Sequence, residues 1–230
     1  MPTVAGMSGT LYLVRHGQTV YNVEGRLQGW CDSPLTTPGV AGVRDTAERL
    51  ADRAFVAAYV SPSPRTRATA ELLLAHHRHV PVREMPDLRE FGFGRAEGER
   101  EVDLLPELDP YDMWLGIVDG TFAGFPGGET GERFRARVLR GFRAIEARHP
   151  QGEVLVVSHC LTLMSYLATI DPARTAPPRN AGVAVVELAP RRLVSIESRE
   201  PGPGEAGPRT AGTVGTVGTV GEGELTRSTA

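Results

Sequence analysis

The sequence contains short apolar runs that each end in polar or charged residues, and this feature limits the possible folds most. The clearest runs are Leu11 to Val14, Phe55 to Val60 and Val154 to Val157. Runs this short are typical of strands buried on both faces of a sheet. Stretches with helical spacing lie between them, which predicts a single three-layer α/β domain with a mainly parallel central sheet and helices on both faces. Two later runs, Val183 to Leu188 and Leu193 to Ile196, predict a closing hairpin or a pair of adjacent strands.

Three stretches have the start signals and the apolar stripe of surface helices. The first follows Thr36, the second begins at Ser63-Pro64, and the third ends at Pro150. The apolar face of the third helix consists of Phe134, Val138, Phe142 and Ile145. Its opposite side, which we expect to face solvent, carries Arg133, Arg137, Arg140 and Arg148.

Composition divides the chain into three regions. Residues 1–10 are predicted to be a flexible N-terminus and residues 11–200 one domain, because this length can bury a core of its own. Residues 201–230 are rich in Gly, Pro and Thr and are predicted to be disordered. Within the domain, residues 95–129 carry nine acidic residues and only two arginines. We interpret them as a partly helical insertion near the site.

The charged residues and cysteines exclude several kinds of chemistry. All 25 basic residues are Arg, so no P-loop, Schiff-base or pyridoxal-phosphate lysine exists in the chain. A net charge of -3 without a long basic run favours a small-molecule ligand over nucleic acid or a membrane surface. Cys31 and Cys160 have neither metal-binding nor disulfide spacing. Because no basic leader and no apolar span of roughly 20 residues is present, we expect a cytoplasmic protein. We expect it to be a monomer or a homodimer.

Polar residues follow the three clearest strands at the point where each strand ends. Arg15-His16-Gly17 follows the first, Ser61 to Arg65 the second, and Ser158-His159 the third. Ligands of open α/β sheets bind beyond the carboxyl ends of the strands. Arginines bridge phosphate oxygens bidentately, and a neutral histidine between them can attack phosphorus once a hydrogen bond fixes its tautomer. We therefore expect a phosphate site with His16 as nucleophile.

Several motifs in order resemble one known family, the histidine phosphatase superfamily, in its phosphoglycerate-mutase-like branch. The matching segments are Leu13 to Thr19 with Asn22, Gln28 to Thr36, Ser61 to Thr66, Leu88 to Phe91, Phe93-Gly94, Glu97-Gly98, Gly127 to Glu129 and Val156 to His159. The resemblance implies a phosphoglycerate-mutase-like fold and no metal or other cofactor. It implies that His16 is the phosphorylated nucleophile, that Arg15, Arg65 and His159 surround the phosphoryl oxygens and supply positive charge, and that Glu90 is the general acid and base. It also places Asn22, Gln28 and Gly29 along the phosphate or adjacent substrate pocket.

The sequence departs from the family at Cys160, where the family usually has glycine after the second histidine. A thiol near several cations and a helix start can have a lowered pKa and be oxidised. One hypothesis is therefore that Cys160 is an oxidisable thiol; the alternatives are that its larger side chain crowds the pocket or alters the start of the helix that follows.

Three functions remain open from the sequence. A phosphatase gives the phosphohistidine to water, whereas a phosphoglycerate mutase returns it to substrate and needs extra basic residues between Glu90 and His159. The insertion that lies between them, residues 95–129, is short and acidic, which favours phosphomonoester hydrolysis on a small metabolite such as a sugar phosphate, a carboxylate ester or a nucleotide-loop precursor. A non-catalytic module that binds phosphorylated ligands is the third hypothesis, and the presence of both His16 and Glu90 argues against it.

Overall fold

The computed structural model describes residues 8–104, 109–173 and 178–197, which form one α/β domain around a six-stranded sheet. The strand order is β3-β2-β4-β1-β5-β6. The strands are β1 (Thr10–Arg15), β2 (Phe55–Val60), β3 (Val82–Glu84), β4 (Glu153–Ser158), β5 (Val183–Leu188) and β6 (Arg191–Glu197). Pairings β3-β2, β2-β4 and β4-β1 are parallel, and β1-β5 and β5-β6 are antiparallel. The predicted mainly parallel sheet is confirmed.

The structure adds to the predicted strands at several points. β3 was not predicted, because its residues are all exposed and form no apolar run. The predicted hairpin is confirmed, but β6 begins at Arg191 rather than Leu193. Thr10 already belongs to β1 and Ser8 forms a bridge to Gln151, so the fold starts before residue 11. Residues 1–7 and the predicted disordered tail 201–230 lie outside the described residues.

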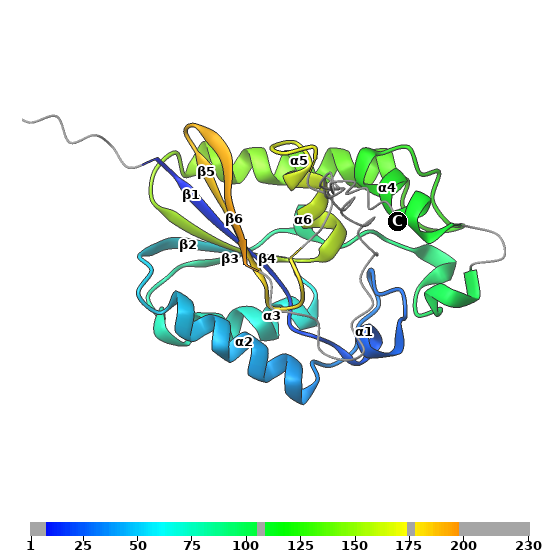
Figure 1. Cartoon of the computed structure of the whole chain (residues 1–230), viewed down its shortest axis with the longest axis horizontal. Helices are drawn as coiled ribbons and strands as arrows, with labels where there is room; N and C mark the ends of the chain where they lie inside the picture. The colour runs from blue at the N-terminus through cyan, green and yellow to red at the C-terminus, as the bar shows by residue number, and fades with distance from the viewer. Residues whose placement is uncertain (1–7, 105–108, 174–177, 198–230) are drawn as a thin grey trace, which may run out of the picture.

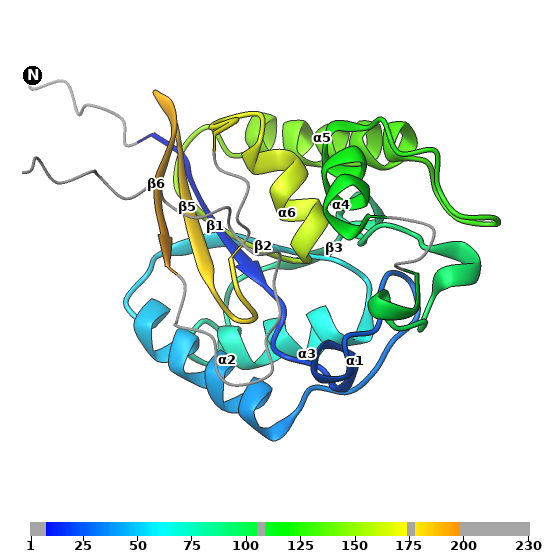
Figure 2. The same ribbon diagram turned by 45° about the vertical axis from the view of Figure 1, so that its right-hand side comes forward.

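Helices cover both faces of the sheet, as Figures 1 and 2 show. On one face lie α2 (Thr37–Leu50) and α3 (Pro64–Leu73), and on the other α4 (Pro110–Asp119), α5 (Gly131–Arg148) and α6 (Cys160–Leu167). A short helix, α1 (Val20–Glu24), follows β1, and single 3-10 turns η1 to η4 span Leu74–His76, Pro86–Leu88, Gly94–Ala96 and Glu101–Leu104. The predicted three layers are thus present, and the predicted insertion is partly helical.

Local signals explain where the long helices begin and end. The Thr36 hydroxyl accepts the N–H of Gly39 at the start of α2, and the Thr130 hydroxyl accepts that of Arg133 at the start of α5. Such capping satisfies N–H groups that have no partner inside the helix. Helix α5 ends at Arg148, before Pro150, as the sequence predicts.

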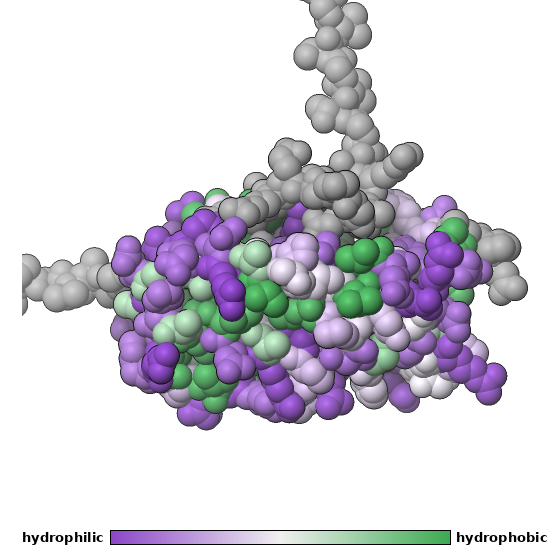
Figure 3. All heavy atoms as spheres, turned by 90° about the horizontal axis from the view of Figure 1, so that it is seen from below, coloured by the Kyte–Doolittle hydropathy of each residue, from purple (hydrophilic) through white to green (hydrophobic). Residues whose placement is uncertain are grey.

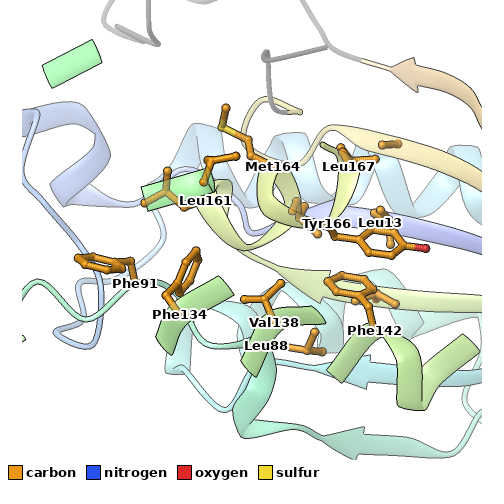
Figure 4. Close-up of a cluster of buried hydrophobic side chains, with 14 of the residues drawn as sticks. Leu13, Leu88, Phe91, Phe134, Val138, Phe142, Leu161, Met164, Tyr166 and Leu167 are labelled. Atoms are coloured by element: carbon orange, nitrogen blue, oxygen red, sulfur yellow. The ribbon is translucent and has the colours of Figure 1, made fainter. Parts of the chain in front are cut away.

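Alternate strand residues feed two separate cores. Leu11 and Leu13 of β1 pack with α4, α5 and α6, whereas Tyr12 and Val14 pack with α2 and α3. Figure 4 shows the first core, in which Phe142 of α5 lies against Tyr166 of α6 with ring centroids 3.8 Å apart. The sheet is therefore fixed from both sides, which holds the ends of its strands in place.

Hydrophobic residues also gather in the middle of the outer face over α2 and α3 (Figure 3). A groove of about 680 Å³ is lined there by Pro34, Leu35, Val40, Ala68 and Leu72 among others. None of the predicted catalytic residues except Arg65 lines this groove. The candidate site is therefore a different place, at the edge of the sheet.

Candidate active site

The carboxyl ends of β1, β2 and β4 meet at one edge of the sheet. Arg15 pairs in register with Ser158, and Val60 with Val157. The residues that follow these strand ends are therefore neighbours, and the rings of His16 and His159 lie 5.3 Å apart. The predicted convergence of the two histidines is present in the structure.

His16 is buried and held in one tautomer. Its Nδ1 lies 2.8 Å from the carbonyl oxygen of Gly17, and since a carbonyl only accepts, Nδ1 carries the proton in this hydrogen bond. Burial, together with the charges of Arg65 and Arg15, lowers the pKa of His16 well below its ordinary value. The imidazole is therefore neutral near pH 7, and its Nε2 keeps a lone pair for attack.

Arg65 lies in the first turn of α3 and is almost completely buried. Its Nε is 3.4 Å from Nε2 of His16. Nη1 donates to the Cys31 carbonyl and to Asp32, and Nη2 donates to the carbonyls of Gln28 and Gly29. These acceptors fix the guanidinium plane beside His16.

The loop that holds Arg65 is itself organised by a carboxylate from the insertion. Glu97 accepts the backbone N–H groups of Gly29, Trp30 and Cys31, and also that of Phe93, at 2.9 to 3.1 Å. A Cβ at Gly29 would overlap the Phe91 carbonyl oxygen and lie 2.5 Å from Glu97 Oε1. Glycine is therefore required at position 29 by this close approach.

Glu90 follows the turn η2 and lies at the start of α6. Its Oε1 accepts the N–H groups of Phe91 and Thr162 and the Thr162 hydroxyl, and its Oε2 accepts the N–H of Leu161. Burial raises the pKa of Glu90, against the effect of these N–H groups and of Arg65 and Arg15. A carboxyl with a raised pKa is suited to exchange protons near neutral pH.

His159 donates to or accepts from Ser61, with Nε2 and Oγ 2.7 Å apart. Burial and the charge of Arg65 lower the pKa of His159 well below its ordinary value. Without a bound anion, desolvation and the neighbouring cations favour the neutral ring. That His159 supplies positive charge to a bound phosphate stays a prediction. Among the described residues, the buried Nδ1 of His159 and Nε of Arg15 have no hydrogen-bond partner. Nε of Arg15 is a donor, and Nδ1 of His159 is a donor in the tautomer whose Nε2 accepts the Ser61 hydroxyl, so this edge of the sheet can donate to an anionic ligand.

The residues expected to line the pocket lie next to the site, but their side chains hold the surrounding structure. The side chain of Gln28 binds Thr19 and Ser33, and its carbonyl accepts from Arg65. Asn22 forms a capping box with Thr19 at the start of α1. Their side chains thus fix the two loops on either side of His16 and Arg65.

The family model of the histidine phosphatase superfamily (branch 1) matches residues 11–198. The chain belongs to this superfamily. It is 30% identical over 159 residues to the uncharacterized phosphatase PhoE of Bacillus subtilis, an alignment that spans 69% of the chain and 76% of PhoE. It is 31% identical over 167 residues to the 2,3-bisphosphoglycerate-dependent phosphoglycerate mutase 2 of Gloeobacter violaceus, spanning 70% and 75% of the two chains. The crystal structure of the alpha-ribazole phosphatase from Shigella flexneri superposes with a TM-score of 0.70 at 29% identity, over 84% of this chain and 98% of that one.

The structure of this histidine phosphatase adds residues that the sequence did not single out for the site. Asn180 donates to the His16 carbonyl and to the side chain of Asn22, and Ser61 binds His159. Thr162 binds both Glu90 and the Arg89 carbonyl. Of these residues, only Ser61 could be associated with the site from the sequence, because it directly follows a predicted strand. The contacts of Asn180 and Thr162 join segments far apart in the chain.

The hypothesis of an oxidisable thiol at Cys160 is not supported. Burial raises the pKa of Cys160 to about 11, although the Arg15 charge opposes this. Desolvation of the thiolate therefore outweighs the nearby cation and the helix start.

Glycine at position 17 lets α2 pack against the end of β1, because a Cβ there would lie 2.7 Å from Cγ2 of Val43.

Within residues 8–104, 109–173 and 178–197, no group of three or more His, Cys, Asp or Glu is arranged to hold a metal ion. The helices of those same segments are all too short or too polar to cross a membrane.

Proposed function

We propose that this protein hydrolyses small phosphomonoesters through a covalent phosphohistidine on Nε2 of His16. The observation that carries the proposal is the buried, neutral His16 whose Nδ1 is held by the Gly17 carbonyl while Nε2 lies beside Arg65. A fixed tautomer with its lone pair next to a cation is the arrangement that nucleophilic attack on a bound phosphate requires.

In the first half-reaction Arg15 and Arg65 bind the phosphoryl oxygens and offset their charge. His16 Nε2 attacks phosphorus, the N–P bond forms, and the P–O bond to the leaving group breaks. Protonated Glu90 gives its proton to the leaving oxygen, so that a neutral alcohol departs. Oε2 of Glu90 accepts one N–H in the described structure and so has capacity left to carry that proton.

In the second half-reaction water attacks the phosphohistidine. Glu90, now ionised, takes a proton from the water, the new O–P bond forms, and the N–P bond breaks to release neutral His16 and phosphate. A phosphate dianion beside His159 raises the pKa of that ring. His159 can therefore take up a proton when substrate binds, although burial keeps it neutral otherwise.

Transfer to water rather than to a second phosphoglycerate is supported by the region between Glu90 and His159. The insertion, residues 95–129, carries nine acidic residues and only two arginines. A region with so few basic residues does not favour a second phosphate or a carboxylate on the substrate. The relatives include proteins named as phosphatases and several named as phosphoglycerate mutases, so the mutase is the alternative that the test must address.

The test is turnover of a panel of phosphomonoesters, with 3-phosphoglycerate plus 2,3-bisphosphoglycerate assayed in parallel, for wild type and His16→Ala. We expect phosphate release by wild type, none above background by His16→Ala, and an acid-labile phosphoryl group trapped on wild type alone. Efficient isomerisation of 3-phosphoglycerate without phosphate release would replace the phosphatase by the mutase. Tight binding without any turnover would support a non-catalytic module.

A further inference from the structure

The helical pattern predicts that Arg137 of α5 faces solvent, but in the structure it does not. Its side chain is only 12% exposed, and its guanidinium lies under the segment that carries Glu90. Nη1 donates to the carbonyls of Asp87 at 3.1 Å and Arg89 at 2.7 Å, and Nη2 donates to the carbonyl of Glu90 itself at 2.8 Å. One side chain thus binds three carbonyls around the proposed acid and base.

Glu129 completes this arrangement from the end of the insertion. Its carboxylate binds Nε of Arg137 at 2.6 Å and Nη2 at 2.7 Å, and its side chain is 11% exposed. Glu129 also binds the other end of the same segment, through its carboxylate to the Gly92 N–H and through its own N–H to the Gly92 carbonyl. The pair therefore fixes both sides of Glu90 along the chain.

The opposite side of the segment is held by apolar packing. Leu88 and Phe91 are fully buried in the core with Phe134, Val138 and Leu161 from α5 and α6 (Figure 4). These contacts fix the two neighbours of the Arg89-Glu90 peptide, but they do not set the rotation of that peptide. The Arg89 carbonyl accepts from Arg137 and from the Thr162 hydroxyl, and the Glu90 carbonyl accepts from Arg137 and from Nε1 of Trp30. These hydrogen bonds set the direction of both carbonyls, and Arg137 is the side chain that binds them both.

We propose that Arg137, held by Glu129, is a positioning residue that aims the Glu90 carboxyl at the leaving group. This inference rests on the proposed function, in which Glu90 exchanges protons. Rotation of the Arg89-Glu90 peptide would move the carboxyl away from the N–H groups of Leu161 and Thr162, which donate hydrogen bonds to it.

Arginine suits this position because its donors lie in a rigid planar fork. Five donor sites in fixed directions serve three carbonyls and one carboxylate at once. Lysine keeps the charge but has no planar fork, so Arg137→Lys separates the geometry from the charge.

The experiment measures kcat/KM for a series of aryl and alkyl phosphates of increasing leaving-group pKa. A proton donor matters most for poor leaving groups, so Glu90→Gln gives the reference pattern. For Arg137→Lys and Glu129→Gln we expect kcat/KM to fall on the order of 10- to 100-fold on phenyl phosphate and on an alkyl phosphate. On p-nitrophenyl phosphate, which needs little protonation, we expect a fall of less than about threefold. Inhibition by inorganic phosphate should be unchanged, because the arginines that bind it are intact.

Arg140→Lys is the matched control. Arg140 lies on the same helix and binds the same segment, through the side chain of Asp87, but its side chain is 64% exposed and it touches no carbonyl next to Glu90. We expect wild-type kcat/KM across the series.

The outcomes separate this inference from the proposed function. An equal loss on all substrates in Arg137→Lys and Glu129→Gln, with Glu90→Gln showing the leaving-group dependence, would overturn the positioning role and leave the mechanism intact. No phosphate release by wild type, or no effect of Glu90→Gln on any substrate, would instead refute the proposed function. Melting temperature is recorded for every variant, and Glu129→Gln carries the test if Arg137→Lys does not fold.

Discussion

The carboxylate of Glu97 joins the insertion to the loop that holds Arg65, and its replacement by glutamine has a calculable effect. Oε1 accepts the N–H groups of Trp30 and Phe93, and Oε2 those of Gly29 and Cys31. In Glu97→Gln one oxygen becomes an NH2 group, which cannot accept. Whichever way the amide turns, two backbone N–H groups lose their acceptor and face another donor.

Leaving a buried donor unpaired costs about 1–3 kcal/mol. Glu97 is only partly buried and water can replace part of the loss, so we take about 1 kcal/mol for each N–H and about 2 kcal/mol in total. For a domain of this size that corresponds to a decrease of about 4–8 °C in Tm. The carbonyls of the same loop also orient Arg65, so kcat/KM for a phosphomonoester should fall on the order of 10-fold, with weaker inhibition by inorganic phosphate.

The assay is thermal unfolding by circular dichroism together with phosphate release, and the control is Glu99→Gln. Glu99 lies two residues further along and its side chain is exposed, so its loss should leave both quantities unchanged. A Tm of Glu97→Gln within 1 °C of wild type would refute the reasoning about the four N–H groups. A lower Tm with unchanged phosphate inhibition would show that the loop does not orient Arg65.

Three further predictions concern the site histidines, the core and the thiol. Burial lowers the folded-state pKa of both site histidines, so between their folded and unfolded values the unfolded chain binds more protons. Stability to urea should therefore be nearly constant above about pH 7.5 and decrease as pH falls below the unfolded-state pKa of about 6.5, and a profile that stays flat from about pH 7.5 to about pH 5.5 would contradict it. Phe142→Ala removes a fully buried ring stacked on Tyr166 and should cost about 3–5 kcal/mol in urea unfolding, whereas Arg143→Ala on the exposed side should cost less than about 0.5 kcal/mol. Cys160, with a pKa of about 11, should react with iodoacetamide at pH 7.5 far more slowly than free cysteine, and rapid labelling seen by mass spectrometry would show that its thiolate is accessible.

Residues next to the strand ends could be predicted from the sequence alone. Arg15, His16 and His159 follow apolar runs, and parallel strands bring their carboxyl ends to one edge of the sheet. The same rule predicts the place of Arg65, which follows the second apolar run and lies at the start of a predicted helix. Backbone periodicity is local, so it is already present in the order of apolar and polar residues.

Glu90 was found by resemblance and not by pattern. It follows the single turn Pro86–Leu88, which has no periodicity from which its direction could be inferred. The carboxyl finds its place only because the start of α6, about 70 residues later, offers the N–H groups of Leu161 and Thr162. Such a contact depends on how α6 packs.

The layered fold and the position of His16 beside its arginines follow from the sequence alone, because these depend on local spacing and on the shared edge of parallel strands. The surroundings of Arg137, Glu97 and Cys160 come only from the tertiary structure. Helical spacing assigned Arg137 to solvent, but the Glu90 segment crosses α5 at that point and covers it. Desolvation likewise raises the pKa of the Cys160 thiol and lowers that of His159, and desolvation depends on the atoms that distant segments place around a group.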